Sequence, residues 1–241
     1  MRVGMTRERK DQSMENGMKK VGVRALYRNP DASIAYPLLA RLAYPWEALS
    51  HISEFILELG KTLSDGEYER IGEDVWIART AKVAKTASVN GPCIICADAE
   101  VRHCAFIRGS AIVGRGAVVG NSTELKNCIL FDGVQVPHYN YVGDSILGYK
   151  SHMGAGAVTS NVKSDKTPVS VAIDGGRIPT GRKKFGAMLG DFVEIGCNSV
   201  LNPGTVIGTG SNIYPLSSVR GYVEENSIYK ASDCIVKKEN R

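Results

Sequence analysis

The stretch VPHYNYVGD, residues 136–144, places one imidazole and two phenols within nine residues. His138 is the candidate general base, because an imidazole titrates near neutral pH and can accept a proton there. A solvent-facing histidine at the corner of a repeat would look similar, but it would require no change in the repeat, and the repeat changes here. Tyr141 offers a hydroxyl for a phosphate or an amine, although large aromatic side chains also pack between subunits.

Two cations elsewhere in the chain occupy the same position within a six-residue repeat. Arg108 (in FIRGS) and Lys126 (in ELKNC) lie eighteen residues apart, which is three units of a six-residue repeat. If three units make one coil, the two side chains lie on the same face in adjacent coils. Either one alone could be a solvated surface charge. Together they suit a phosphate group such as that of a sugar 1-phosphate, and we predict an anion site formed by the pair.

The elements that must position these groups follow that six-residue repeat. A period of six matches neither an amphipathic helix at 3.6 residues nor an alternating strand at 2. It predicts a parallel β-helix with three short faces per coil, in which each aliphatic residue stacks inside on its copies in adjacent coils. Four positions after most of these residues comes a small residue, which fits a crowded inward corner. The aliphatic or equivalent residue recurs at eleven consecutive positions: Ile71, Ile77, Val83, Val89, Ile95, Val101, Ile107, Val113, Val119, Leu125 and Phe131.

The frame does not continue unbroken. After Phe131 it shifts twice, stops after Met153, and resumes beyond a non-repetitive stretch at 160–186. About twenty repeats at three per coil predict six or seven coils. The first shift falls on VPHYNYVGD. Our hypothesis is that the coil departs there from its regular shape and turns His138 and Tyr141 outward, toward a neighbouring subunit.

The sequence therefore predicts an all-β fold, a parallel β-helix preceded by a short helical segment. Apolar residues at helical spacing indicate a helix from about Trp46 to Leu59, with Pro45 in its first turn and Gly60 at its end. The predicted organisation is a flexible tail over 1–35, a helical segment over 36–68, a β-helix domain over 69–230 with an inserted loop at 160–186, and a C-terminal tail over 231–241.

Composition excludes several classes of protein. Hydrophobic residues make up 43% and charged residues 23%, and the net charge is only +5, so neither disorder nor nucleic-acid binding is expected. No apolar run is long enough to span a membrane. Six cysteines are too sparse for a disulfide scaffold, which predicts a reduced, cytoplasmic protein. The pair CIIC at 93–96 is a weak metal signal, since Cys93 falls in the inward small-residue position.

The repeat, seen in VGRGAV and IGTGSN, resembles the hexapeptide signature of left-handed parallel β-helix acyltransferases. FIRGSAIVGRGAVVGNSTELKNCIL and VPHYNYVGDSILGYKSHMGAGAVTSN resemble the acetyltransferase half of bifunctional glucosamine-1-phosphate acetyltransferase / N-acetylglucosamine-1-phosphate uridyltransferase. YPWEAL and GRIPTGRKKFGAMLGD are more similar to the archaeal-type sugar-phosphate nucleotidyltransferases that carry the same β-helix. The resemblance covers roughly residues 43–230.

This resemblance implies a left-handed coil, a homotrimer with active sites between neighbouring β-helices, and acetyl-CoA as co-substrate with no metal required. The implied reaction is N-acetylation of an amino-sugar phosphate, with glucosamine 1-phosphate as the best match. His138 aligns with the catalytic histidine. Ala155, in HMGAGAV, aligns with the position whose backbone N–H faces the reacting carbonyl of acetyl-CoA, and its flanking glycines permit close approach.

Further residues acquire expected roles from the same resemblance. Asn161 aligns with a family asparagine that contacts the substrate, and Lys184 matches a family substrate lysine. Arg108, Lys126 and Tyr141, singled out above by spacing and residue type, are expected to bind the same substrate. The remaining cations of the inserted loop would contact the phosphates of CoA or simply keep the loop solvated: Lys163, Lys166, Arg177, Arg182 and Lys183.

Three departures from the family pattern stand out. His152 replaces an asparagine that contacts the sugar, and Cys197 replaces a serine near the acetyl group, which puts the sugar specificity in doubt more than the transfer chemistry. About seventy residues precede the β-helix, and VGMTRERK lacks the glycines of a nucleotide loop. Nucleotidyl transfer is therefore not expected.

Two other functions compete with this one. A zinc carbonic anhydrase on the same coil would need three histidines converging from adjacent subunits, but His103, His138 and His152 lack the short spacing expected of it. A non-catalytic trimeric scaffold, or a regulatory partner of a separate sugar nucleotidyltransferase, would require no particular side chains. The joint presence of Arg108, Lys126, His138 and Ala155 argues against a scaffold.

Overall fold

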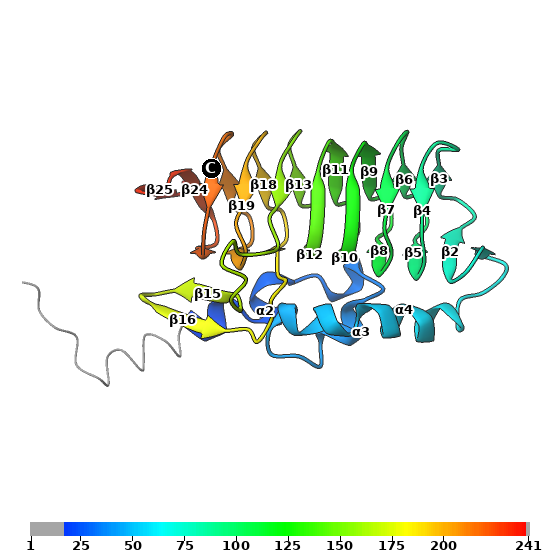
Figure 1. Cartoon of the computed structure of the whole chain (residues 1–241), viewed down its shortest axis with the longest axis horizontal. Coiled ribbons are helices and arrows are strands. Elements are labelled where there is room, and N and C mark those ends of the chain that lie inside the picture. The colour runs from blue at the N-terminus through cyan, green and yellow to red at the C-terminus, as the bar shows by residue number, and fades with distance from the viewer. Residues whose placement is uncertain (1–16, 240–241) are drawn as a thin grey trace, which may run out of the picture.

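The computed structural model describes residues 17–239 (Figure 1). It confirms the parallel β-helix that the six-residue repeat predicts. Each coil contributes one short strand to each of three walls, and corresponding strands of successive coils pair in parallel. Wall 1 has eight such strands, and so has wall 2, which is more than the six or seven coils predicted. The count was low because three strands fall outside the recognised six-residue frame: Val158–Thr159, Tyr222–Val223 and Ser227–Ala231.

The three walls are met in order along each coil. Wall 1 consists of β2 (Val75–Ala78), β5 (Cys93–Ile95), β8 (Ala111–Val113), the second halves of β10 (Glu124–Leu130) and β12 (Tyr141–Leu147), β17 (Ala187–Leu189), β20 (Thr205–Ile207) and β23 (Tyr222–Val223). Wall 2 consists of β3 (Lys82–Val83), β6 (Glu100–Val101), β9 (Val118–Asn121), β11 (Gln135–His138), β13 (His152–Met153), β18 (Glu194–Ile195), β21 (Asn212–Ile213) and β24 (Ser227–Ala231). Wall 3 consists of β4 (Ser88–Val89), β7 (Phe106–Ile107), the first halves of β10 and β12, β14 (Val158–Thr159), β19 (Val200–Leu201) and β22 (Ser218–Val219).

The core lies inside the coil and follows the predicted pattern. From Ile95 to Phe131 every aliphatic position is buried, and so is every small position from Cys93 to Thr123. Ile71 is an exception. It lies in β1 (Tyr68–Ile71), which pairs antiparallel with β2 outside the coil, and its side chain is 49% exposed. A six-residue period cannot distinguish a first coil from a strand folded back against it.

The frame shifts correspond to shorter coils. Val75 pairs with Cys93 eighteen residues on, whereas Val118 pairs with Gln135, and Gln135 with His152, seventeen residues on in each case. One residue has been removed from each of these coils while the strand ladder stays intact.

The shortening falls at the corner between walls 3 and 1, where Ile107 and Val113 are six residues apart but their partners Leu125 and Leu130 are five apart. The corner that carries His138 keeps its length, because Val119 and Leu125 are six residues apart and so are Val136 and Val142. The hypothesis that the frame shift reshapes the His138 corner is therefore wrong: within VPHYNYVGD the departure lies at its end, near Gly143 and Asp144.

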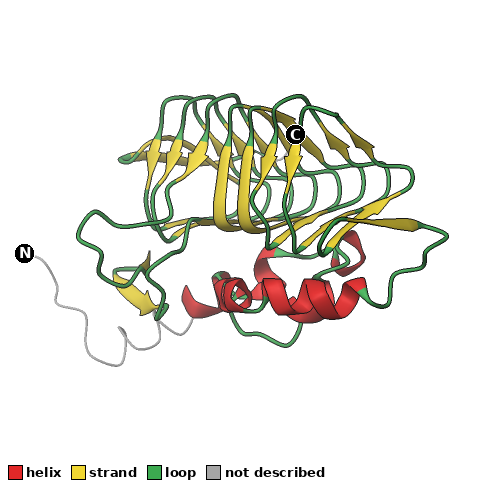
Figure 2. Ribbon diagram, turned by 45° about the vertical axis from the view of Figure 1, so that its right-hand side comes forward, coloured by secondary structure: helices red, strands yellow, loops and turns green. Residues whose placement is uncertain are grey.

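The segment before the coil covers wall 1 (Figure 2). The predicted helix over 46–59 is split into the 3-10 helix η2 (Pro45–Ser50) and α4 (Ile52–Gly60), and the predicted shorter turn is α3 (Tyr36–Leu39). The outward side chains of wall 1 are apolar, among them Ile94 and Ile112, and they are fully buried. Their burial against the helices stabilises both layers, because apolar surface leaves water on both sides.

The predicted tail over 1–35 is wrong for the part that the structure describes, since residues 17–35 are packed against the coil. This part includes α2 (Val23–Leu26) and the 3-10 helix η1 (Pro30–Ala32), and Leu26 and Tyr27 are 1% exposed. The buried carboxylate of Asp191 holds the segment in place, because it accepts hydrogen bonds from the Arg28 N–H at 2.9 Å and the Asn29 Nδ2 at 2.7 Å. Residues 1–16 of the predicted tail lie outside the described residues.

The two remaining irregular segments also contain strands. The inserted loop at 160–186 carries an antiparallel hairpin of β15 (Ser170–Ile173) and β16 (Gly176–Pro179). The predicted C-terminal tail over 231–241 is wrong up to residue 239, because β25 (Cys234–Lys237) pairs antiparallel with β24; residues 240–241 lie outside the described part. Within residues 17–239 no helix is both long and apolar enough to cross a bilayer.

The six cysteines fall into two classes that predict a simple chemical result. Cys93, Cys96 and Cys128 are buried, and burial raises the pKa of the Cys96 and Cys128 thiols to about 12 and raises that of Cys93 as well. Thiolate is the reactive form, so these three should resist iodoacetamide at mildly alkaline pH in the folded protein. The exposed thiols are Cys104, Cys197 and Cys234. Intact-mass measurement should show three adducts in the folded state and six after denaturation, and rapid modification of Cys93 or Cys96 in the folded state would contradict the buried positions.

Candidate active site

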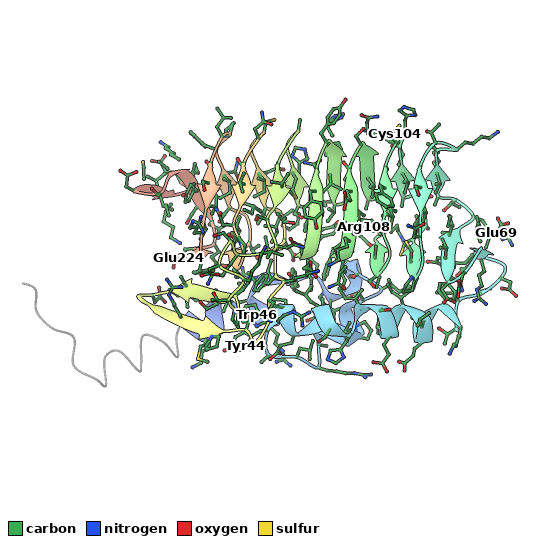
Figure 3. All side chains as sticks on the ribbon, in the orientation of Figure 1. Tyr44, Trp46, Glu69, Cys104, Arg108 and Glu224 are labelled. Atoms are coloured by element: carbon green, nitrogen blue, oxygen red, sulfur yellow. The ribbon has the colours of Figure 1, made fainter. Side chains whose placement is uncertain are left out.

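The predicted catalytic histidine lies at the corner between walls 2 and 3. His138 is the last residue of β11, and Tyr141 is the first residue of β12 after a two-residue turn in which Tyr139 has a φ of +51°. Cys104 belongs to the same row of corners, because Ser122 N–H donates to the His103 carbonyl in the coil next to it. Figure 3 shows Cys104 at the edge of the coil that faces away from the N-terminal helices.

The corner is fixed by Asn140, a buried residue that the sequence analysis did not single out. Its Nδ2 donates to the carbonyls of Gly154 at 2.8 Å and Ala157 at 3.0 Å, and its Oδ1 accepts the His138 N–H at 3.1 Å. The side chain therefore ties the histidine coil to the next coil. A signal for it existed, since Asn140 stands four positions after Val136, where the repeat otherwise has a small apolar residue.

Three of the predicted residues form one row along this corner. Gly156 N–H donates to the His138 carbonyl at 3.0 Å, which places Ala155 beside His138 in the next coil. Asn198 N–H donates to the Ala155 carbonyl at 2.8 Å, which places Cys197 beside Ala155 in the coil after that. The structure thus brings His138, Ala155 and Cys197 together in successive coils.

The two groups proposed to do the chemistry are open to a ligand. The His138 side chain is exposed, and no hydrogen bond formed by the described residues involves its imidazole. The Ala155 backbone N–H is half-buried and has no acceptor within residues 17–239, although the N–H groups of Gly154 and Gly156 on either side of it are both bonded. A proton acceptor and an unsatisfied N–H donor therefore lie side by side.

A second group of predicted residues surrounds a buried carboxylate in the adjoining coils. Asp144 has only 3% of its side chain exposed. Lys126 Nζ lies 3.1 Å from its Oδ2, Asn161 Nδ2 donates to Oδ2 at 2.6 Å, and Asn127 Nδ2 donates to Oδ1 at 2.9 Å. Asn161 Nδ2 also lies 3.2 Å from the Tyr141 hydroxyl. Burial raises the pKa of Tyr141, with the negative charge of Asp144 acting in the same direction.

Arg108 and Lys126 lie on one wall in adjacent coils, as their spacing predicts, because Ile107 pairs with Leu125. Each of them is also paired with a carboxylate. Arg108 Nη1 lies 2.7 Å from Glu124 Oε1, and this carboxylate raises the pKa of the Arg108 guanidinium. Figure 3 shows Arg108 on the flank of the coil, between the Cys104 edge and the helices. The two carboxylates, Glu124 and Asp144, were missed from the sequence.

The side chains of the last two predicted residues form no hydrogen bond or ion pair with these groups in the described part of the chain. His152 is in wall 2, where its Nδ1 lies 2.8 Å from Glu194 Oε2 on the neighbouring strand, so its Nε2 remains available. Lys184 is exposed at the base of the inserted loop, where its backbone bridges to Val162. Among the described residues there is no group of three or more histidine, cysteine, aspartate or glutamate side chains that could hold a metal ion.

Comparison with known proteins gives one family match. The family described as the GMPPB C-terminal domain matches residues 89–207. The bifunctional protein GlmU of Methanococcus vannielii is 37% identical over 137 residues, covering 56% of this chain and 33% of that protein. GlmU of Methanococcus maripaludis strain C5 is 33% identical over 202 residues, covering 82% of this chain and 49% of that protein.

A third relative comes from another archaeon. The bifunctional sugar-1-phosphate nucleotidylyltransferase/acetyltransferase of Sulfurisphaera tokodaii is 30% identical over 174 residues, covering 65% of this chain and 43% of that protein. The chain thus spans between a third and a half of the length of these three curated relatives.

Proposed function

This chain contains a hexapeptide-repeat acetyltransferase domain, and from that starting point we propose that it transfers an acetyl group from acetyl-CoA to the amine of an amino-sugar phosphate, most narrowly glucosamine 1-phosphate. The observation that carries the proposal is the corner row. There an exposed imidazole, His138, lies beside the backbone N–H of Ala155 on the adjacent coil, which has no acceptor among the residues that the structure describes. A scaffold would require neither group.

The two groups divide the reaction between them. The Nε2 or Nδ1 of His138 removes a proton from the acceptor amine as its nitrogen attacks the thioester carbonyl. The Ala155 N–H donates to the carbonyl oxygen as negative charge develops on it. When the tetrahedral intermediate collapses, the C–S bond breaks, and the imidazolium returns its proton to the departing CoA thiolate. The amide and free CoA are the products, and the histidine ends in its original neutral state.

The remaining residues have binding roles in this proposal. Cys197, next to Ala155, contacts the acetyl end of acetyl-CoA. Arg108, Lys126, Tyr141, Asn161 and Lys184 surround the sugar phosphate, and His152, held by Glu194, offers its free Nε2 to the sugar hydroxyls. His138 projects from the outer edge of the coil, and its imidazole has no partner among residues 17–239, which supports a homotrimer in which a neighbouring β-helix completes each site.

The proposal is tested by the release of CoA thiol from acetyl-CoA in the presence of different acceptors. We expect turnover with glucosamine 1-phosphate, weaker turnover with galactosamine 1-phosphate or glucosamine 6-phosphate, and the least with unphosphorylated glucosamine. Size-exclusion chromatography with light scattering on the same sample should give three times the mass of the chain. Purified, folded protein that acetylates none of these acceptors would contradict the proposal and favour a scaffold.

A further inference from the structure

The inserted segment delivers an arginine to the Asp144 cluster with a fixed backbone. Val169 N–H donates to the Arg182 carbonyl at 2.7 Å, and the Arg182 N–H donates to the Thr180 hydroxyl at 3.3 Å. The Thr180 hydroxyl in turn donates to the Val169 carbonyl. Arg182 is therefore held at the neck of the hairpin formed by β15 and β16, and little backbone freedom remains to be lost when its side chain binds a ligand.

The same neck is tied directly to the proposed site. Phe185 N–H donates to the Asn161 carbonyl, and Gly186 N–H donates to the Asp144 carbonyl, each at 2.9 Å. The Phe185 ring is buried and stacks on Trp46 of the helical segment, with ring centroids 5.6 Å apart. Phe185 and Gly186, three and four residues after Arg182, are thus bonded through their backbone N–H groups to two members of the cluster.

The cations near the Asp144 cluster differ in whether a carboxylate neutralises them. Arg108 is paired with Glu124, and Lys126 with Asp144, whereas Arg182 forms no ion pair in the part of the chain that the structure describes. Its Nε is buried without a hydrogen-bond partner. Burial lowers the pKa of its guanidinium, and the negative charge of Asp144 opposes this effect. Asp144 already receives hydrogen bonds from three other side chains.

A half-buried guanidinium with an unbonded Nε is poised for an anion from outside the chain. We propose that Arg182 binds the phosphate group of the acceptor, so that the inserted segment supplies a phosphate-binding guanidinium whose charge is not already neutralised by a carboxylate. This inference rests on the proposed function. A guanidinium suits the task because it can present two parallel N–H donors to two phosphate oxygens, whereas the Lys126 ammonium is a point charge held by Asp144.

The test compares acceptors with and without phosphate. In Arg182→Gln we expect the KM for glucosamine 1-phosphate to rise by about tenfold to a hundredfold, the loss typical of a charge-assisted hydrogen bond. The KM for acetyl-CoA and the kcat/KM for unphosphorylated glucosamine should change by less than about twofold, because neither depends on this contact. Arg182→Lys should recover only part of the affinity for glucosamine 1-phosphate, since it restores the positive charge without the two parallel N–H donors of a guanidinium.

Arg177→Gln is the matched control. Arg177 is an exposed arginine of β16 in the same segment, so its replacement removes the same charge without touching the cluster. It should leave the KM for glucosamine 1-phosphate and the kcat/KM for unphosphorylated glucosamine unchanged, and melting temperatures should show that every variant is folded.

Two kinetic results would overturn the assignment. If the kinetic constants for phosphorylated and unphosphorylated acceptors change equally in Arg182→Gln, Arg182 supports the structure of the site and does not bind the phosphate. If instead only the KM for acetyl-CoA rises, and dephospho-CoA thioester is unaffected, the phosphate bound is that of CoA.

A binding experiment separates this inference from the acetyl-transfer proposal. Glucose 1-phosphate lacks the amine and cannot be acetylated, so its calorimetric titration into wild type and Arg182→Gln needs no turnover. Binding by the wild type that is lost in Arg182→Gln supports the inference even if no acceptor is acetylated. Equal binding by the two proteins, or none by the wild type, contradicts it.

Discussion

His138→Ala is expected to lower kcat by about a hundredfold to ten-thousandfold, the usual contribution of a positioned general base. The imidazole makes no hydrogen bond within residues 17–239 and is exposed, so its removal should leave the melting temperature nearly unchanged. Steady-state assays with acetyl-CoA and glucosamine 1-phosphate should show the loss in kcat, with little change in the KM for acetyl-CoA.

His103→Ala provides the matched control for this prediction. His103 is another exposed histidine of the same row of corners, bonded only to neighbouring surface groups, Thr86 and Cys104. Its replacement should leave kcat unchanged. If His138→Ala keeps more than about a tenth of the wild-type rate, or if both variants lose activity equally, His138 is not the base.

Gly120→Ala is expected to destabilise the protein by more than about 3 kcal/mol, beyond the usual cost of overpacking a core. A Cβ on Gly120, in β9, would lie 1.6 Å from the Pro137 carbonyl oxygen and 2.4 Å from the Pro137 Cα. These are backbone atoms of β11, so no rotamer change can relieve the contact and the strand itself must move. His138 is the next residue, and the remaining folded protein should have lost most of its activity.

Denaturant titration of Gly120→Ala against wild type measures the change in unfolding free energy, and the acetyl-transfer assay below the unfolding transition measures the second effect. Gly66→Ala is the control, because a Cβ there would come no closer than 3.4 Å to a side-chain atom, that of Ser64. It should be neutral in both measurements. A Gly120→Ala protein with wild-type stability would mean that β9 and β11 are not packed as closely as described.

The sequence predicted the coil well because each six-residue unit must bury one aliphatic residue, so the period is imposed by the core itself. It did not predict that the chain from Gly17 onward covers wall 1. The apolar outward residues there, such as Ile94 and Ile112, are recognisable as a second buried surface only once the walls are known. Ile71 matched the frame by coincidence, since an antiparallel strand tolerates the same residue type.

The site was predicted unevenly for similar reasons. His138, Ala155 and Cys197 came from the family resemblance, and no spacing rule would have aligned them, because the coils between them differ in length. Lys126 and Asp144 are eighteen residues apart and could have been found by the rule that paired Arg108 with Lys126. Arg182 could not, because the position of its side chain depends on how the inserted segment folds back.

The antiparallel strands at the two ends of the coil have a consequence for how the protein behaves at high concentration. A bare parallel coil would offer open strand edges on which further coils or other molecules could stack, a common route to aggregation. Here β1 pairs antiparallel with β2 and β25 with β24, so one ladder at each end, that of wall 1 at the first coil and that of wall 2 at the last, ends in a strand that runs in the wrong direction for another coil. Both end strands carry charged residues, including Glu69, Arg70 and Lys237, while most of the other end strands are only two residues long. These end strands therefore disfavour the stacking of one molecule's coil on another at either end.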